Sequence, residues 1–322
     1  MSWVGIDVFS HPFWAISTVI LGLVVRSLRR GSWDPRVCDV QLKGQTAIVT
    51  GANTGIGKFI ALDFARRGAR VIMACRSEAR GRTALREIQE LSGNANVHLR
   101  LVDTSSLASV RAFAEGILLE EKALHILINN AGASGLPRKI TSDGLEVSFA
   151  TNHLGPFLLT NLLLDLLKRS APSRIVNVSS AMHRHGKVDF SHFQSDNLND
   201  GLSVYNHTKL HNVICSNELA RRLQGSGVSV NSVHPGVVKT EVMRHYKFLV
   251  RLIFNLVGIF FFKSAEEGAT STIYCAVAEE TEGITGKYFD SDCSLVLPAL
   301  LARDRGLGAK DFEICERLTS KP

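Results

Sequence analysis

The feature that most constrains the fold of this chain is a regular alternation of short apolar runs with longer amphipathic segments. The runs lie at 46–50, 71–75, 97–102, 126–128, 175–178 and 228–233, and several of them are almost continuously apolar, as in strands buried on both faces. Between them, helical periodicity predicts helices at 58–67, 78–91, 106–119, 146–168 and 204–223, the fourth interrupted near Gly155 and Pro156. Buried strands separated by helices indicate a parallel sheet covered on both faces. We therefore expect an α/β fold with a doubly wound parallel sheet.

The composition fits one large domain. The chain has 322 residues, 45% of them hydrophobic, and the alternation continues without a linker.

Its six cysteines are scattered without a C-x-x-C pair, so we expect reduced thiols. The net charge is +7, but the basic residues form no nucleic-acid-reading motif, which argues against a nucleic-acid partner. We expect no metal, because ligand spacing is missing around His183, His185, His207 and His211.

An uncharged segment near the N-terminus, 13–25, is expected to anchor the chain in a membrane. Arg26, Arg29 and Arg30 follow it directly and no lysine or arginine precedes it, whereas a cleaved signal peptide carries its basic residues in front. The positive-inside rule then places the rest of the chain in the cytosol. We assign 1–30 to the anchor with its basic flank and 31–322 to a single domain. Because the run is short for a spanning helix, an amphipathic or buried helix is the alternative.

A second apolar stretch, 248–262, has two interpretations. Arg251 and Asn255 interrupt it, so it is a poor candidate for a membrane span. It is either an exposed apolar surface that receives a lipid substrate from a membrane or a buried core helix.

Three glycines lie in the turn between the first expected strand and its helix. Gly51, Gly55 and Gly57 have the spacing Gly-x3-Gly-x-Gly. Glycines there let backbone N–H groups approach a pyrophosphate at a helix N-terminus, where the helix dipole favours negative charge. The turn gains weight because it follows a strand and opens a helix.

A Tyr-x-x-x-Lys pair lies on the helix expected at 204–223. Tyr205 and Lys209 are four residues apart and therefore share a helix face. An ammonium about 4 Å from a phenol favours the phenolate by about 4 kcal/mol at an effective dielectric of ~20. Such a pair can exchange a proton with a substrate, although by itself the motif is common by chance.

Four motifs occur together in one order: Thr50 to Gly57, Asn129 to Gly132, Val178 to Ser180, and Tyr205 to Lys209. With them, the chain resembles the short-chain dehydrogenase/reductases over nearly all of residues 40 to 320. The resemblance implies a Rossmann-type dinucleotide-binding sheet and a catalytic set of Ser180, Tyr205, Lys209 and Asn152.

Within that set, the resemblance gives each residue a role. Ser180 would hydrogen-bond the substrate oxygen, and Tyr205 would pass the proton. Lys209 would also hold the nicotinamide ribose, and Asn152 would position a water near the lysine.

The same resemblance implies an NADP(H) site. Arg76, at the end of the second strand, and Lys58, after the last glycine, suit a ribose 2′-phosphate, whereas Glu78 is the rival that would favour NAD. The expected cofactor-binding residues are Gly51, Asn53, Thr54, Gly55, Ile56, Gly57, Lys58, Arg76, Asp103, Asn130, Ala131, Gly132, Tyr205, Lys209, Pro235, Gly236, Val238 and Thr240.

Within the family, the chain looks most like the microsomal, NADP-preferring retinol dehydrogenases. This similarity implies an NADP(H)-dependent oxidoreductase in the endoplasmic reticulum or another intracellular membrane, facing the cytosol. Its partners would be membrane lipid and a lipophilic alcohol or aldehyde, with a homodimer left open. The alternatives are a steroid or lipid-aldehyde carbonyl reductase, and a membrane-tethered nucleotide-binding scaffold without catalysis.

Overall fold

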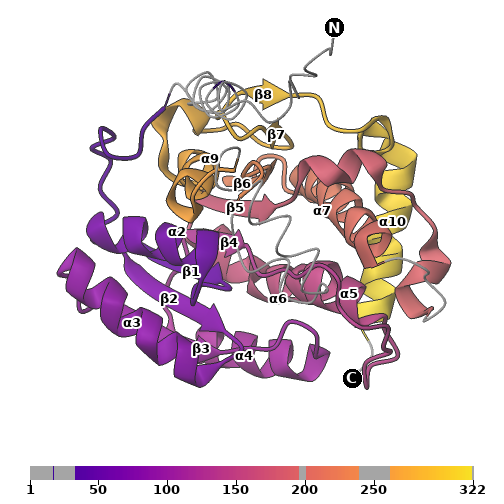
Figure 1. Ribbon diagram of the computed structural model, residues 1–322, viewed down its shortest axis with the longest axis horizontal. Coiled ribbons are helices and arrows are strands. Elements are labelled where there is room, and N and C mark those ends of the chain that lie inside the picture. Colours follow the sequence, from indigo (N-terminus) through magenta and orange to yellow (C-terminus); the bar gives the residue numbers. More distant parts are fainter. Residues whose placement is uncertain (1–16, 18–32, 196–200, 239–261, 321–322) are drawn as a thin grey trace, which may run out of the picture.

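An eight-stranded sheet forms the middle layer of the molecule. A computed structural model describes residues 17, 33–195, 201–238 and 262–320 (Figure 1). The strand order is β3-β2-β1-β4-β5-β6-β7-β8, and all neighbours pair in parallel except β7 and β8. The strands are β1 (Thr46–Thr50), β2 (Arg70–Cys75), β3 (Val97–Leu101), β4 (Ile126–Asn129), β5 (Ser173–Val178), β6 (Val228–Val233), β7 (Tyr288–Phe289) and β8 (Leu295–Val296). The predicted doubly wound parallel sheet is confirmed, and the antiparallel edge is an addition to it.

Helices cover both faces of this sheet (Figure 1). Against one face pack α4 (Leu107–Glu120), α6 (Gly155–Arg169) and α7 (Gly201–Arg222), with α10 (Arg305–Thr319) outside α7. Against the other pack α2 (Gly55–Arg66), α3 (Glu78–Ser92) and α9 (Ala265–Val277). Successive residues of a strand point to opposite faces. Accordingly, Ile48 lies in the first core and Val49 in the second, which explains why the middle of β1 is continuously apolar.

Short segments complete the chain between these elements. A helical stretch before α6 consists of α5 (Val147–Phe149) and a π-helical turn, η2 (Ala150–Leu154). The predicted 146–168 helix is therefore present, with its irregularity just before Gly155. The 3₁₀ turns are η3 (Ala181–His185), η4 (Phe190–Gln194), η6 (Glu279–Thr281) and η7 (Leu300–Arg303).

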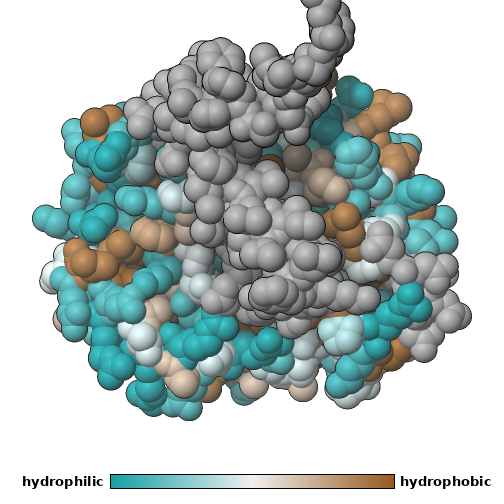
Figure 2. Space-filling view, viewed as in Figure 1, coloured by the Kyte–Doolittle hydropathy of each residue, from teal (hydrophilic) through white to brown (hydrophobic). Residues whose placement is uncertain are grey.

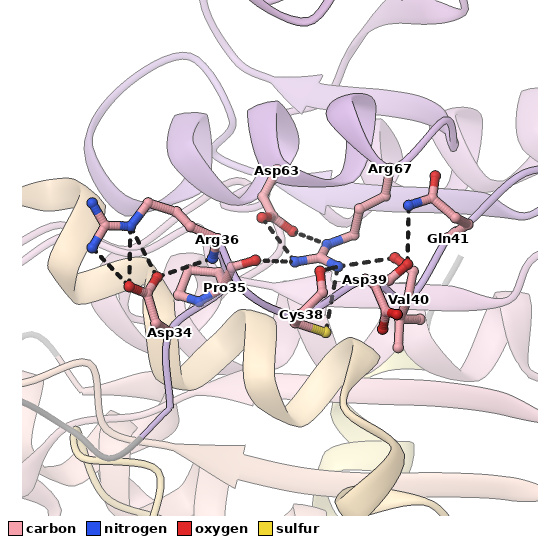
Figure 3. A network of polar contacts seen from close by, with 9 residues as sticks. All are labelled: Asp34, Pro35, Arg36, Cys38, Asp39, Val40, Gln41, Asp63 and Arg67. Atoms are coloured by element: carbon pink, nitrogen blue, oxygen red, sulfur yellow. Dashed lines mark hydrogen bonds and ion pairs between the residues drawn. The ribbon is translucent and has the colours of Figure 1, made fainter.

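A buried arginine fastens the segment before β1 to the C-terminus of α2 (Figure 3). The guanidinium of Arg67 donates to the backbone carbonyls of Pro35, Cys38 and Val40 at 2.8–2.9 Å. It also pairs with the carboxylate of Asp63, one turn earlier, at 2.6 Å. Only 5% of Arg67 is exposed, so the charge is neutralised almost entirely by protein groups. This contact fixes the path by which the chain enters the sheet.

The predicted membrane anchor, 13–25, and the apolar stretch 248–262 fall almost wholly outside the described residues. Of 13–25 only residue 17 is described, and of 248–262 only Phe262. In the part of the chain that the structure describes, no helix is both long and apolar enough to cross a bilayer. On the face shown in Figure 2, described hydrophilic side chains predominate and the apolar ones form small separate groups.

Candidate active site

A cleft lies along the edge of the sheet where the parallel strands end. Its volume is about 250 Å³. The segments that follow β1 to β6 all contribute lining residues, because the carboxyl ends of parallel strands meet at one edge of a sheet. Of the expected site residues, those lining it are Gly51, Asn53, Thr54, Gly55, Ile56, Arg76, Asp103, Asn130, Ala131, Gly132, Ser180, Tyr205, Lys209, Pro235, Gly236 and Val238. Thr240 lies outside the described residues.

The glycine-rich turn brings backbone close to the cleft. Gly51 and Gly55 have φ angles of 70° and 56°, a conformation that favours glycine. A Cβ on Gly57 would lie 2.5 Å from both the Asn130 Nδ2 and the Gly51 carbonyl oxygen. Gly57 therefore serves close packing and does not line the cleft. The turn fits a pyrophosphate, since α2 begins at Gly55 and presents unpaired N–H groups of its first turn there.

Thr50, which the motif analysis left without a role, ties this turn to the segment after β4. Its Oγ1 accepts from the backbone N–H groups of Asn130 and Ala131, both at 2.9 Å. In return, Asn130 Nδ2 donates to the carbonyl oxygen of Thr50 at 2.8 Å. The two motifs that sequence analysis placed apart thus form one rigid floor of the cleft.

The cationic side chains at the β2 end differ in part from those expected. Arg76 lines the cleft, and so does Arg80 from the first turn of α3. Lys58 does not: its ammonium contacts the Glu87 carboxylate on α3. Glu78 also points elsewhere, since it pairs with Arg82 at 2.6 Å. Sequence analysis missed Arg80 because its direction depends on how α3 begins, after the cap at Ser77.

Tyr205 and Lys209 lie on one face of α7 at the cleft. The Lys209 Nζ is 5.5 Å from the centroid of the Tyr205 ring and donates to the Val178 carbonyl oxygen at 2.8 Å. The Ser179 Oγ donates to the Lys209 carbonyl oxygen at 2.9 Å, which holds the helix to the end of β5. Only 3% of Lys209 is exposed, and this burial lowers its pKa from the usual 10.5 to about 8. Lys209 therefore loses its proton more easily than a free lysine, although the ammonium still predominates at pH 7.

Ser180 is held by the turn that follows β5. Its Oγ accepts from the Met182 N–H at 3.2 Å. The buried His183 bridges this turn to a distant segment, since its Nδ1 donates to the Ser180 carbonyl oxygen at 2.7 Å and its Nε2 accepts from the Ala299 N–H at 3.0 Å. Burial lowers the pKa of His183, which keeps the ring neutral and suits this pair of bonds. His183 therefore positions the serine.

Asn152 lies in the π-helical turn, behind the cleft wall. Its Oδ1 accepts from the Ala133 N–H at 2.8 Å, while its Nδ2 donates to the Ala133 carbonyl oxygen at 2.9 Å and to Thr208 Oγ1 at 3.2 Å. A Cβ on Gly132 would lie 3.4 Å from both Asn152 Oδ1 and Lys209 Nζ. Asn152 therefore lies near Lys209, as expected for the predicted catalytic set. Its amide, however, contacts the backbone at Ala133 and Thr208 of α7, and so holds these two segments together. π-helical turns frequently occur at functional sites.

Comparisons with known proteins agree with this geometry. Residues 45–247 match the family model described as short chain dehydrogenase. Retinol dehydrogenase 11 of Mus musculus is 46% identical over 302 residues, covering 93% of this chain and 94% of that protein. Retinol dehydrogenase 12 of Homo sapiens is 48% identical over 281 residues, with coverages of 87% and 88%.

Solved structures show the same architecture. An uncharacterized protein from Mycobacterium Paratuberculosis aligns with a TM-score of 0.72 and 31% identity, covering 90% of this chain and 98% of that chain. The actinorhodin polyketide ketoreductase with NADPH aligns with a TM-score of 0.61 and 26% identity, with coverages of 76% and 95%.

Proposed function

The chain belongs to the short chain dehydrogenase family, and from that premise we propose that it interconverts retinol and retinal with NADP(H). It is an oxidoreductase that acts on a CH–OH group. The observation that carries the proposal is the pairing of Tyr205 and Lys209 on one face of α7, beside Ser180 in the cleft. The retinoid is supported by the names of relatives that are 46% and 48% identical over most of both chains.

In this proposal the residues of the cleft transfer one proton and stabilise the negative charge that develops on the substrate oxygen. The bound nicotinamide cofactor supplies or accepts the hydride. The phenol of Tyr205 gives its proton to the substrate oxygen in reduction and takes it back in oxidation. Ser180 donates its O–H to the same oxygen, since the bond in which its Oγ accepts from the Met182 N–H does not use this proton. Lys209 stabilises the phenolate, and Asn152 acts only by positioning.

Substituting the proton donor tests the reaction. Tyr205→Phe should lower kcat by at least a hundredfold, the usual contribution of a positioned proton donor, and leave NADPH affinity within a fewfold of wild type. Tyr274→Phe is the control, because Tyr274 packs edge-on against Trp33 in the other layer. Retinol, retinal, a steroid alcohol and a short soluble aldehyde should be assayed in parallel. Activity confined to the steroid would reject the retinoid, and full activity of Tyr205→Phe would reject the mechanism.

We infer a preference for NADP(H) over NAD(H). The support is that Arg76 and Arg80 both line the cleft where the segment after β2 ends, whereas Glu78 pairs with Arg82 away from it. A guanidinium forms strong charge-assisted hydrogen bonds with a phosphate, and its hydrogen bonds with an uncharged ribose hydroxyl are weaker. Arg76→Ala and Arg80→Ala should each weaken NADPH about tenfold or more and NADH by much less. Arg86→Ala, at an exposed position of α3, is the control. Equal losses for both cofactors would refute the inference.

We also propose that residues 1–30 attach the domain, 31–322, to the endoplasmic reticulum membrane, facing the cytosol. The support is the uncharged run 13–25 followed by Arg26, Arg29 and Arg30. The protein should resist extraction with alkaline carbonate, and protease added to intact microsomes should digest the domain. Deletion of 1–30 should release it. Protection of the domain inside sealed microsomes would place it in the lumen and refute the proposal.

A further inference from the structure

A buried cluster of ligand-type side chains lies outside the candidate active site, where α10 packs on α7 (Figure 1). His153 of the π-helical turn, Cys215 of α7, and Asp311 and Cys315 of α10 each bring one donor atom to within 4.8 Å of the others. None of the four is more than 7% exposed. The reaction proposed above uses none of them, so their proximity requires a separate explanation.

The distances within the cluster are close to those of a tetrahedral metal site. His153 Nε2 lies 3.2 Å from Cys315 Sγ and 4.0 Å from Cys215 Sγ, and Cys215 Sγ lies 3.4 Å from Asp311 Oδ2. In a tetrahedral zinc site, Zn–N near 2.0 Å and Zn–S near 2.3 Å set donor atoms roughly 3.3–3.8 Å apart. One of these separations lies within that range, one is just below it and one is just above it. No two of the four donor atoms are more than 4.8 Å apart, so the side chains need to draw together only slightly to hold an ion.

The histidine is held in the tautomer that a metal requires. Asn212 Nδ2 donates to the Asn152 carbonyl oxygen at 3.0 Å, so Asn212 Oδ1 is the atom that faces His153 Nδ1, at 2.8 Å. Nδ1 therefore carries the proton, and the lone pair of Nε2 points at the sulfurs. Metal-binding histidines almost always donate their second ring nitrogen in this way.

The carboxylate is oriented by a partner of its own. His211 Nδ1 contacts Asp311 Oδ1 at 2.7 Å, with both side chains fully buried, which leaves Oδ2 for the cluster. A cavity of about 30 Å³ borders His153 and Cys215 and gives these side chains room to adjust. Two of the four donors thus have their outer hydrogen bonds already in place.

We propose that His153, Cys215, Asp311 and Cys315 bind one Zn²⁺ ion in tetrahedral coordination. Two Zn–S bonds, one Zn–N bond and one Zn–O bond form, and the two thiol protons leave to solvent. Thiolate and imidazole donors at tetrahedral spacing are the preferred set of zinc among common divalent ions. Four protein ligands leave no open position, so the ion is structural. It joins α10 to α7 and to the turn that bears Asn152.

The experiment uses the full chain, purified with a tag that contains no histidine. Elemental analysis should find about one zinc per chain. After removal by a chelator, added Co²⁺ should produce the absorption of thiolate-to-cobalt charge transfer, and added Zn²⁺ should abolish it. Cys215→Ala and Cys315→Ala should each lower bound zinc at least tenfold. Cys275→Ala is the control, because Cys275 is equally buried but lies in α9, against the other face of the sheet.

The wild-type chain alone can refute the proposal, whether or not the variants fold. Metal-free wild-type protein that takes up neither Zn²⁺ nor Co²⁺ would overturn it. So would zinc content that is unchanged in Cys315→Ala, or a Cys215–Cys315 disulfide found by mass spectrometry of the protein as purified. A normal zinc content with no retinol dehydrogenase activity would count against the proposed function and leave the zinc site supported.

Discussion

Replacing the buried lysine of the cleft should make the protein more stable and inactive. Burial lowers the pKa of Lys209 from 10.5 to about 8, so the protonated side chain destabilises the folded state relative to the unfolded state. At about 1.36 kcal/mol per pKa unit, the cost is about 3 kcal/mol. Lys209→Met removes the charge but leaves the Val178 carbonyl without its donor, which costs about 1 kcal/mol. We expect a net gain of about 2 kcal/mol at pH 7 without cofactor.

The pH dependence of this gain separates it from ordinary repacking. A lysine whose pKa is lowered by folding destabilises the folded state fully below pH 8, and the penalty fades as the pH rises toward 10.5. Between pH 7 and pH 9.5 the wild type should therefore recover about 2 kcal/mol relative to Lys209→Met. The advantage of the variant should then be close to zero.

Urea unfolding of the full-length wild type and variant at both pH values measures this difference. Lys122→Met is the control, because Lys122 is exposed, and it should change stability by less than about 0.5 kcal/mol at either pH. A Lys209→Met protein that is less stable than wild type at pH 7, or a difference that does not vary with pH, would refute the reasoning. Retained oxidoreductase activity would separately reject the catalytic role.

Two further substitutions test the framework around the site. Arg67→Ala should lower the free energy of unfolding by about 3–5 kcal/mol, because it removes the partner of the mostly buried Asp63 carboxylate and of three backbone carbonyls. Arg66→Ala, at an exposed position, should change the free energy of unfolding measured in urea by less than about 0.5 kcal/mol. Gly57→Ala should cost about 1–3 kcal/mol and weaken NADPH binding in a fluorescence titration, because its Cβ meets backbone at 2.5 Å. Gly116→Ala, where a Cβ meets nothing within 4 Å, should stabilise α4 by about 1 kcal/mol, and equal effects of the two glycine changes would contradict the packing argument.

The layers of the fold, and the sheet edge at which the site lies, could be predicted from the amino-acid sequence. Continuous apolar runs specify strands buried on both faces, and each is recognised from its own few residues. Once the sheet is parallel, the residues after each strand must meet, so Gly51, Asn130 and Ser180 could be grouped without coordinates. The Tyr205–Lys209 pair needed only helical spacing.

Which charged groups and which thiols lie next to one another depends on how the helices pack in three dimensions. Lys58 was expected at the cofactor's 2′-phosphate, yet it contacts Glu87, and Arg80 lines the cleft instead. Cys215 and Cys315 read as scattered thiols, and only the packing of α10 on α7 brings them together. Periodicity shows which face of a helix is buried, but not which helix lies against it or at what depth. The contacts of long side chains depend on that depth, as do the burial and lowered pKa of Lys209.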